Sequence, residues 1–319
     1  MDGPASTLLR RAARFLAAYG IFVALAGLFV FLTITKNDTF FTQRNLMNVL
    51  RQNSFTTVLA VGVTLTILTA GIDLSVGSVV ALSGVLCADV LAHGHGIAAG
   101  LAVGLAVGAA VGLVNGALVT RVRIPPFLVT LATMLIVRGA AQKYTGARTI
   151  PIPEPVASAF SVLSDGLFPV AIMAAVLALA GFGLARTPFG RHVYAVGGNA
   201  EAARLCGIRV PRVLLVVYVL CGLLAGLAGV MVASRLASGY PNAGLFYELD
   251  AVAAAVVGGT SLFGGRGSVW GTLAGALFIG ILNNGLNLYE VQQYDQQMVK
   301  GAVLLLATSL DRWRTKETA

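Results

Sequence analysis

Long apolar runs separated by short polar stretches dominate the chain, and nearly all charged residues lie between the runs. Ten runs are candidates for helices that cross a bilayer, which takes about 20 residues per helix. Arg138 lies near the end of the fifth run, where we expect its side chain to snorkel, and Lys300 makes the last run the weakest. The pattern predicts an all-α polytopic membrane protein with about ten transmembrane helices. The runs are 15–35, 54–71, 76–92, 97–119, 125–142, 167–185, 213–234, 249–262, 268–288 and 297–311.

Composition agrees with this fold class and excludes others. The chain is 57% hydrophobic and 11% charged, which rules out a soluble domain. Its net charge of +9 indicates orientation in a membrane rather than nucleic-acid binding. Cys87, Cys206 and Cys221 are odd in number and lack metal-ligand spacing, so neither a disulfide framework nor a metal site is expected. The first run has no clear cleavage site, and we expect an uncleaved span.

Basic residues predict the orientation. If the N-terminus is cytoplasmic and the runs alternate, fourteen lysines and arginines fall inside, six fall outside, and Arg138 and Lys300 lie within runs. Cytoplasmic loops carry the excess of basic residues, so both termini are predicted to be cytoplasmic. The six outside residues are Lys36, Arg44, Arg51, Lys143, Arg148 and Arg235.

Glycine recurs at every fourth position of the fourth run. A strip of bare backbone on one helix face lets another helix approach closely. We therefore expect a tightly packed inner helix, and a similar arrangement, less regular, around Gly222, Gly226 and Gly229. The strip comprises Gly100, Gly104, Gly108, Gly112 and Gly116.

Two glycine-flanked breaks interrupt the apolar pattern. The first break, residues 71–78, contains Asp73 and Ser75, and the second break spans residues 258–268. Paired breaks in two halves of a transporter can mark its transport path. Alternatively, both are tight cytoplasmic turns, with Asp73 capping the next helix as an Asx turn. Asp73 and Ser75 are therefore candidates for the translocation path.

Asparagines supply further polar groups within the runs. Asn115, Asn283, Asn284 and Asn287 could line a path for a hydroxylated solute, which needs neutral donors and acceptors. Alternatively, they form interhelical hydrogen bonds that hold the bundle. Both interpretations stay open at this point.

The chain offers no energy source of its own. A secondary carrier normally has membrane-embedded carboxylates or a sodium site, and Asp73 is the only strong acidic candidate that we identify in a span region. No lysine follows a glycine, so there is no Walker A phosphate loop, and no catalytic constellation stands out. We expect a non-catalytic subunit without a cofactor, with ATP and magnesium on a partner.

The longest polar interruption, residues 186–212, is where such a partner would bind. Within it, Asn199 can cap a short alanine-rich helix that ends at Gly207. Glu201, Ala202 and Ala203, then three residues, then Gly207 resemble the EAA-xxx-G core of the loop by which permeases of ABC importers engage their ATPase subunits. The isoleucine-leucine-proline part of that pattern is not clearly present.

Nearly all of the chain beyond about residue 39 resembles the monosaccharide branch of these permeases, and ribose permeases most of all. The matching stretches are LTILTAGIDLSVGSVVALSGV (65–85), TPFGRHVYAVGGNAEAARLCGI (187–208), YELDAVAAAVVGGTSLFGGRGSVWGTLAGAL (247–277) and ILNNGLNL (281–288). The resemblance implies a type II architecture like that of the vitamin B12 importer, in a bacterial inner membrane.

The resemblance also implies partners and roles. These are a second copy of the permease, ABC ATPase subunits and a periplasmic sugar-binding protein, with import of a pentose-like sugar, ribose first, along the dimer interface. Permeases for xylose, arabinose, galactofuranose and autoinducer-2 share the motifs. Three further classes of protein stay open: a branched-chain amino acid permease, an export or lipid-scrambling permease, and an ATP-independent secondary carrier.

The resemblance gives particular residues a role. Coupling to the ATPase is expected at Asn199, Glu201, Ala202, Ala203, Arg204 and Gly207, with Arg204 and Arg209 pairing acidic residues. Arg44, Arg51 and Arg235 are candidates for docking the binding protein, or else bind lipid headgroups. We expect a cytoplasmic tail at 1–14, a permease domain at 15–311 with its coupling loop at 186–212, and a second tail at 312–319.

Overall fold

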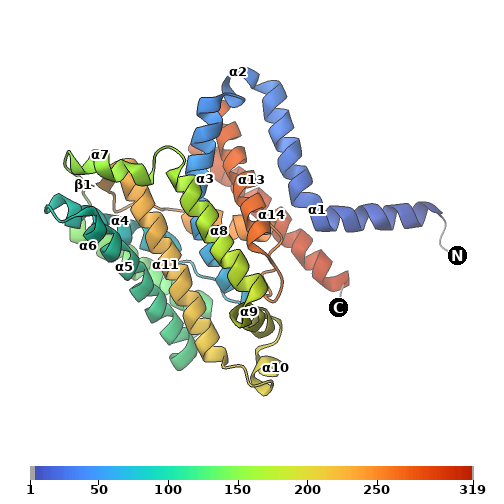
Figure 1. Ribbon diagram of the computed structural model, residues 1–319. Coiled ribbons are helices and arrows are strands. Elements are labelled where there is room, and N and C mark those ends of the chain that lie inside the picture. Colours follow the sequence, from blue (N-terminus) through green and yellow to red (C-terminus); the bar gives the residue numbers. More distant parts are fainter. Residues whose placement is uncertain (1–3, 318–319) are drawn as a thin grey trace.

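Helices form most of the computed structural model, which describes residues 4–317 (Figure 1). The only strands in that range are β1 (Ile150–Pro151) and β2 (Ser238–Gly239), which pair antiparallel. Ten helices overlap the predicted apolar runs: α1 (Pro4–Thr35), α3 (Gln43–Leu68), α4 (Val76–Ala92), α5 (Ile97–Ala117), α6 (Pro126–Thr145), α8 (Phe168–Arg186), α11 (Val210–Leu236), α12 (Tyr247–Val257), α13 (Val269–Leu288) and α14 (Gln293–Glu317). The other described helices are α2 (Asn37–Phe40), α7 (Val156–Phe160), α9 (Pro188–Gly198) and α10 (Ala200–Leu205), with a π-helical turn at Leu118–Val122 and a 3-10 turn at Ser161–Leu163.

Each predicted run therefore has a helix of its own, although the runs at 54–71 and 249–262 extend past the ends of α3 and α12. Within the described residues, four helical segments are long and apolar enough to cross a membrane, and Gly20–Thr35 and Val76–Ala92 are shorter apolar helices. The chain is therefore a multi-pass membrane protein. The four segments are Ile97–Val122, Phe168–Arg186, Val210–Leu236 and Val269–Leu288.

The surface of the bundle is apolar where a soluble protein would be polar. Leu135 and Ile136 on α6 and Leu179 and Phe182 on α8 are all largely exposed, Leu179 to 72%. Large apolar side chains on the outside of a helical bundle are the expected solution where lipid replaces water.

The glycine strip of α5 packs against α11, as predicted. A Cβ atom on Gly108 would overlap the carbonyl oxygen of Gly222, and one on Gly226 would lie 2.6 Å from the carbonyl oxygen of Gly104. The two glycine-rich faces therefore meet each other backbone to backbone. The expectation of an inner helix is wrong, however, because Leu113 and Val114 on the remaining surface of α5 are exposed.

The predicted eighth span is also corrected. α12 has 11 residues, or about 16 Å at 1.5 Å per residue, roughly half of the hydrocarbon thickness of a bilayer. Before it, residues 240–246 form a non-helical segment that reaches the interior, where Gly244 lies against Gly77 at the start of α4. This segment is a third break, which the sequence pattern did not predict.

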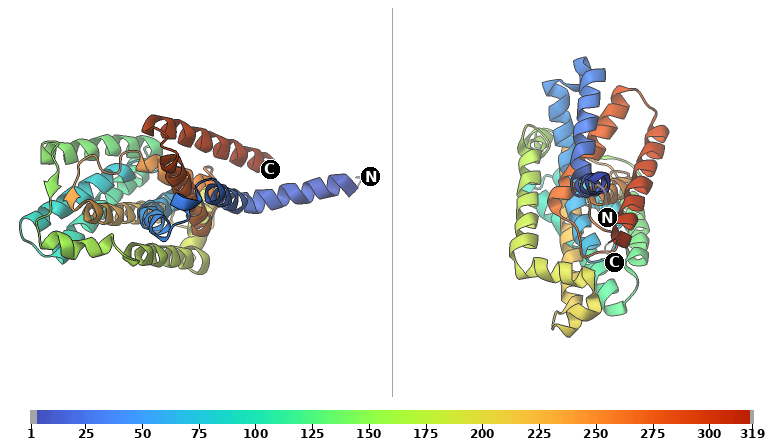
Figure 2. Two further views of the ribbon diagram at one scale, coloured as in Figure 1. Left: turned by 90° about the horizontal axis from the view of Figure 1, so that it is seen from above. Right: turned by 90° about the vertical axis from the view of Figure 1, so that its right-hand side faces the viewer.

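The two ends of the chain extend the first and last helices. Residues 4–14, predicted only as a tail, belong to α1, whose first part projects away from the bundle before the helix turns along it (Figures 1 and 2). α14 continues to Glu317, through most of the predicted second tail. Below, the end of the bundle with α9 and α10 is called the loop end, and the end with α2 and α7 the far end (Figure 1).

Candidate functional site

The polar loop at 186–212 contains two helices, of which the sequence predicted one. α10 is capped as expected: the Asn199 side-chain oxygen accepts a hydrogen bond from the Ala202 amide (2.9 Å), and Gly207 adopts φ of +84°. The Ile208 amide donates to the Ala203 carbonyl at 3.0 Å, which closes the helix in the usual left-handed C-terminal motif. α9 was missed. Its N-cap is Thr187, whose hydroxyl accepts a hydrogen bond from the Gly190 amide, and its first turn contains a proline.

α10 presents one face to the protein and the other to solvent. Ala203 is buried, whereas Glu201 and Arg204 are exposed and approach each other to 3.6 Å. Leu205 is 89% exposed. Leu205 is the last residue of α10, the helix at the tip of the loop end (Figure 1), and the sequence pattern gave it no role.

α9 connects this loop to the end of α3, just before the first break, and to the second break. Val193 and Val196 are buried, and a Cβ on Gly197 would overlap the Leu68 carbonyl oxygen at the end of α3. That same carbonyl accepts a hydrogen bond from the Gly265 amide of the second break at 3.0 Å. We call this contact among Gly197, Leu68 and Gly265 the glycine junction. A further bond, from the Tyr194 hydroxyl to the Gly267 carbonyl (2.9 Å), holds α9 to the second break.

The first break is a buried Asx turn. One carboxylate oxygen of Asp73 accepts from the Ser75 amide (2.9 Å) and from its hydroxyl (2.6 Å), and the Asn115 side chain donates to that hydroxyl at 2.9 Å. Asp73 is 1% exposed. The predicted Asx turn is confirmed, and it lies inside the protein rather than at its surface. The prediction that Asp73 caps the next helix is wrong, because the N-cap of α4 is Ser75, without a capping hydrogen bond from a side chain. None of the three residues lines either of the cavities described below, so their role in a path stays a prediction.

The prediction that the Arg138 side chain snorkels toward the membrane surface is wrong. One guanidinium nitrogen donates to the carbonyls of Pro241 (3.0 Å) and Ala243 (2.7 Å) in the third break. Non-helical backbone at membrane depth must have its polar groups satisfied by protein or water. Arg138 therefore donates hydrogen bonds to two carbonyl groups that have no donor within a helix or strand.

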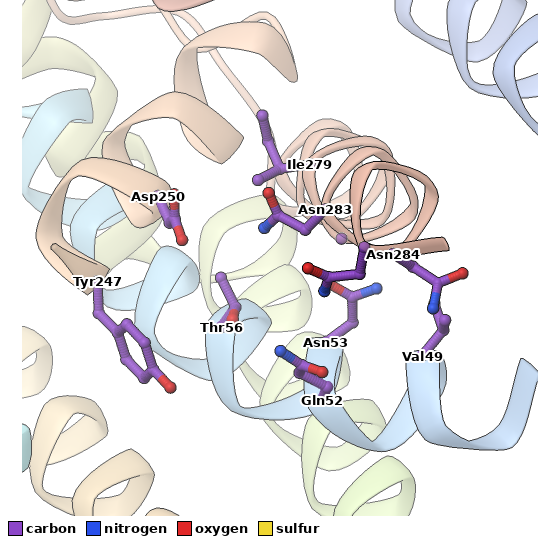
Figure 3. A pocket seen from close by; sticks show the side chains of 11 residues that line it. Val49, Gln52, Asn53, Thr56, Tyr247, Asp250, Ile279, Asn283 and Asn284 are labelled. Carbon is purple, nitrogen blue, oxygen red and sulfur yellow. The ribbon is translucent and has the colours of Figure 1, made fainter. Parts of the chain in front are cut away.

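The asparagines of α13 line a cavity of about 60 Å³ between α3, α12 and α13 (Figure 3). Asn284 exchanges two hydrogen bonds with Asn45 (3.0 and 2.8 Å), and Asn287 accepts one from Gln296 (2.8 Å). These bonds fit the interpretation in which asparagines hold helices together. Asn283 differs, because its buried side-chain oxygen has no partner among the described residues, and neither has the Asn53 side-chain nitrogen.

The prediction that Asp73 is the only strong acidic residue within a span region is wrong. Asp250 lies on α12, largely buried, and its carboxylate is 3.0 Å from the ammonium group of Lys300 on α14. Glu248, 9% exposed, lies against Gly77. Charges at such positions are costly unless paired and are often functional. Sequence reasoning missed the pair because 50 residues separate its members.

The three arginines expected to dock a binding protein lie toward the far end, at the start of α3 and the end of α11. Arg44 is exposed. Arg51 donates to the Gly166 carbonyl (3.0 Å), and Arg235 lies 5.6 Å from the ring of Phe55. Two of the three thus already have contacts within the chain. Whether they bind another protein or lipid stays a prediction.

No metal centre is formed by the described part of the chain: no group of three histidine, cysteine or acidic residues is placed to hold an ion. Cys87 and Cys221 are buried, whereas Cys206 is exposed next to α10, and all three are free thiols.

Comparison with known proteins identifies the family to which the chain belongs. The family model of the branched-chain amino acid transport system / permease component matches residues 45–308. The ribose import permease protein RbsC of Escherichia coli K12 is 46% identical over 302 residues, covering 90% of this chain and 92% of that protein. RbsC of Bacillus subtilis 168 is 47% identical over 293 residues, covering 90% and 91%.

Other sugar permeases are more distant. The D-allose transport system permease protein AlsC of Escherichia coli K12 is 37% identical over 301 residues, covering 93% of this chain and 92% of that protein. No solved structure matches. The family model and these identities show that the chain belongs to the family described as the permease component of the branched-chain amino acid transport system. Within this family of ABC-importer permeases, the chain is similar to RbsC.

Proposed function

We propose that this protein is the transmembrane permease subunit of an ABC importer that moves ribose from the periplasm to the cytoplasm. The observation that carries the proposal is the identity of 46% and 47% to two ribose import permeases, each over 90% of the chain. ATP and magnesium act on separate ATPase subunits, and a periplasmic sugar-binding protein delivers the sugar. Two copies of the permease form a type II transporter with ten helices per copy in the inner membrane, both termini cytoplasmic.

We infer that α10 is the contact with the ATPase. An exposed helix with an unpartnered leucine at its tip fits a groove that covers apolar surface, and Leu205 would fill that groove. Glu201 and Arg204 would lie at its polar rim, with Arg209. Asn199 and Gly207 fix the ends of the helix, and buried Ala203 sets its distance from the bundle.

We also propose that the sugar passes along the dimer interface, with the α13 asparagines among the polar groups near it. Arg44, Arg51 and Arg235 would contact acidic residues on the two lobes of the binding protein. Asp73, Ser75 and Asn115 act by holding the start of α4 in place, which the bonds among them support.

Sequence identity to permeases of different solutes also ranks the candidate solutes. The family model is named for branched-chain amino acids, but ribose permeases match at higher identity than the D-allose permease and the fructose import permease protein FrcC of Rhizobium meliloti, which is 36% identical. The order of these identities favours ribose over another sugar.

Reconstitution tests the proposal. Proteoliposomes with the permease, its ATPase and the binding protein should take up radiolabelled ribose only with ATP present. Liposomes with the permease alone should take up none. Ribose uptake by the permease alone would indicate a secondary carrier, and ATP-driven uptake of leucine but not ribose would indicate an amino acid importer.

A further inference from the structure

A second, larger cavity lies between α12, α13 and α14. It encloses about 290 Å³, close to the lower end of the range for small-molecule sites. Three glutamines of α14, Gln293, Gln296 and Gln297, line it together with the Asp250–Lys300 pair. The Gln296 amide already donates to Asn287 and to the Val291 carbonyl. No hydrogen bond among the described residues uses the side chain of Gln293 or Gln297, so these two amides can donate to and accept from a polar occupant.

This cavity adjoins the smaller one that contains the asparagines. Tyr247, Asp250 and Ile279 line both cavities. Figure 3 shows Asp250 and Asn283 extending toward each other from α12 and α13, with Thr56 of α3 beside them. Asn53 and Asn283, each with a buried side-chain atom that has no partner among the described residues, are among the residues that line the smaller cavity.

We propose that these two joined cavities are a transit site for a neutral polyhydroxyl solute, in which Asp250 accepts hydrogen bonds from two neighbouring hydroxyl groups. A carboxylate has two oxygens and about four acceptor positions, so it can hold a vicinal diol while one oxygen still contacts Lys300. The glutamines, Asn53 and Asn283 bind further hydroxyls, and the Tyr247 ring packs on the apolar face of the sugar. The inference rests on the proposed function and adds to the path along the dimer interface a holding site within each copy, among α3, α12, α13 and α14.

A purely structural role for the pair gives a different expectation. If Asp250 and Lys300 only tie α12 to α14, breaking the pair is harmful because one buried charge is left alone, and removing both charges relieves the damage. If Asp250 binds the solute, removing both charges does not restore transport, because the acceptor is still missing. The double variant therefore separates the two roles.

The experiment compares D250N, D250N/K300M and D250E with the wild type in the reconstituted importer. We expect ribose uptake to fall about tenfold or more in D250N and in the double variant, as loss of hydrogen bonds to a charged acceptor would give, and to recover partly in D250E. D295N, an exposed acid on the same helix as Lys300 that lines neither cavity, serves as the control. Complex assembly and basal ATP hydrolysis, measured on each sample, show that the variants are folded. Wild-type uptake by D250N/K300M overturns the proposal.

A second measurement reads binding directly. In a C206S background, Q297C should react with a hydrophilic maleimide in detergent, and millimolar ribose should slow the reaction severalfold, but not when D250N is added. Labelling that ribose leaves unchanged, in a wild-type complex that imports ribose, refutes this site and leaves the proposed function standing. A complex that imports no ribose refutes the proposed function itself.

Discussion

The glycine junction gives the sharpest test of how movement of the loop reaches the bundle. In G197A the added Cβ would lie 2.6 Å from the Gly265 amide nitrogen and closer still to the Leu68 carbonyl oxygen. Real Cβ atoms essentially never approach other heavy atoms within 3.0 Å, so α9 must move away by at least several tenths of an ångström. Overpacking of this kind costs about 1–3 kcal/mol.

The neighbouring glycine is a matched control. A Cβ on Gly198 would meet no atom within 4 Å, so G198A adds the same methyl group one residue later without displacing α9. We expect G197A to keep ATPase assembly, because α10 and its caps are untouched, but to lose most ribose uptake per ATP hydrolysed. G198A should behave as wild type. The assay is ribose uptake and phosphate release in the same proteoliposomes, with the melting temperature of each permease in detergent. If G197A imports ribose as efficiently per ATP as G198A does, α9 does not transmit movement through this junction.

Three further predictions concern other contacts. L205E should weaken binding of the ATPase, measured by co-purification, without lowering the melting temperature, because the side chain is 89% exposed; a lowered melting temperature with normal binding would contradict it. G108A should destabilise the α5–α11 contact by about 1–3 kcal/mol and lower the melting temperature, whereas G139A, which has open space around its Cβ, should not; equal melting temperatures would refute the packing argument. Reversing the charges of Arg44 and Arg51 should weaken docking of the binding protein, more at low salt than at high salt; docking that stays unchanged at low salt would favour contact with lipid.

Helix positions were predictable because a bilayer forces apolar residues into long runs. The run at 76–92 coincides with α4, and the one at 97–119 with α5 and the first residues of the π-helical turn. The glycine period of α5 was readable for the same reason, since only close helix approach explains five glycines in step. Its partner face on α11 was only suggested, because Gly222, Gly226 and Gly229 do not keep one spacing.

What the sequence did not reveal depends on contacts distant in the chain. Lys300 looked like a flaw in the last run, and its partner Asp250 lay at the edge of a run of alanines. Nothing local connects them, so the pair emerges only when α14 packs beside α12. Arg138 is similar, since its carbonyl partners in the third break are about 100 residues away. α9 had a local signal, a Thr-Pro start before apolar residues at the helical spacing (Phe189, Val193 and Val196), which its glycines and charges obscured.

The contacts at the loop end also explain how one small helix can act on the cavities. α9 touches the end of α3 at Leu68 and the second break at Gly265, and the second break ends α12 and begins α13. These three helices carry Asn53, Asp250 and Asn283 respectively. A displacement of α9 should therefore move all three helices that line the smaller cavity. It reaches α14, which carries Lys300, only indirectly, through α12 and α13. Movement driven from the loop should accordingly shift Asp250 relative to Lys300, and so expose or cover the carboxylate that the sugar needs.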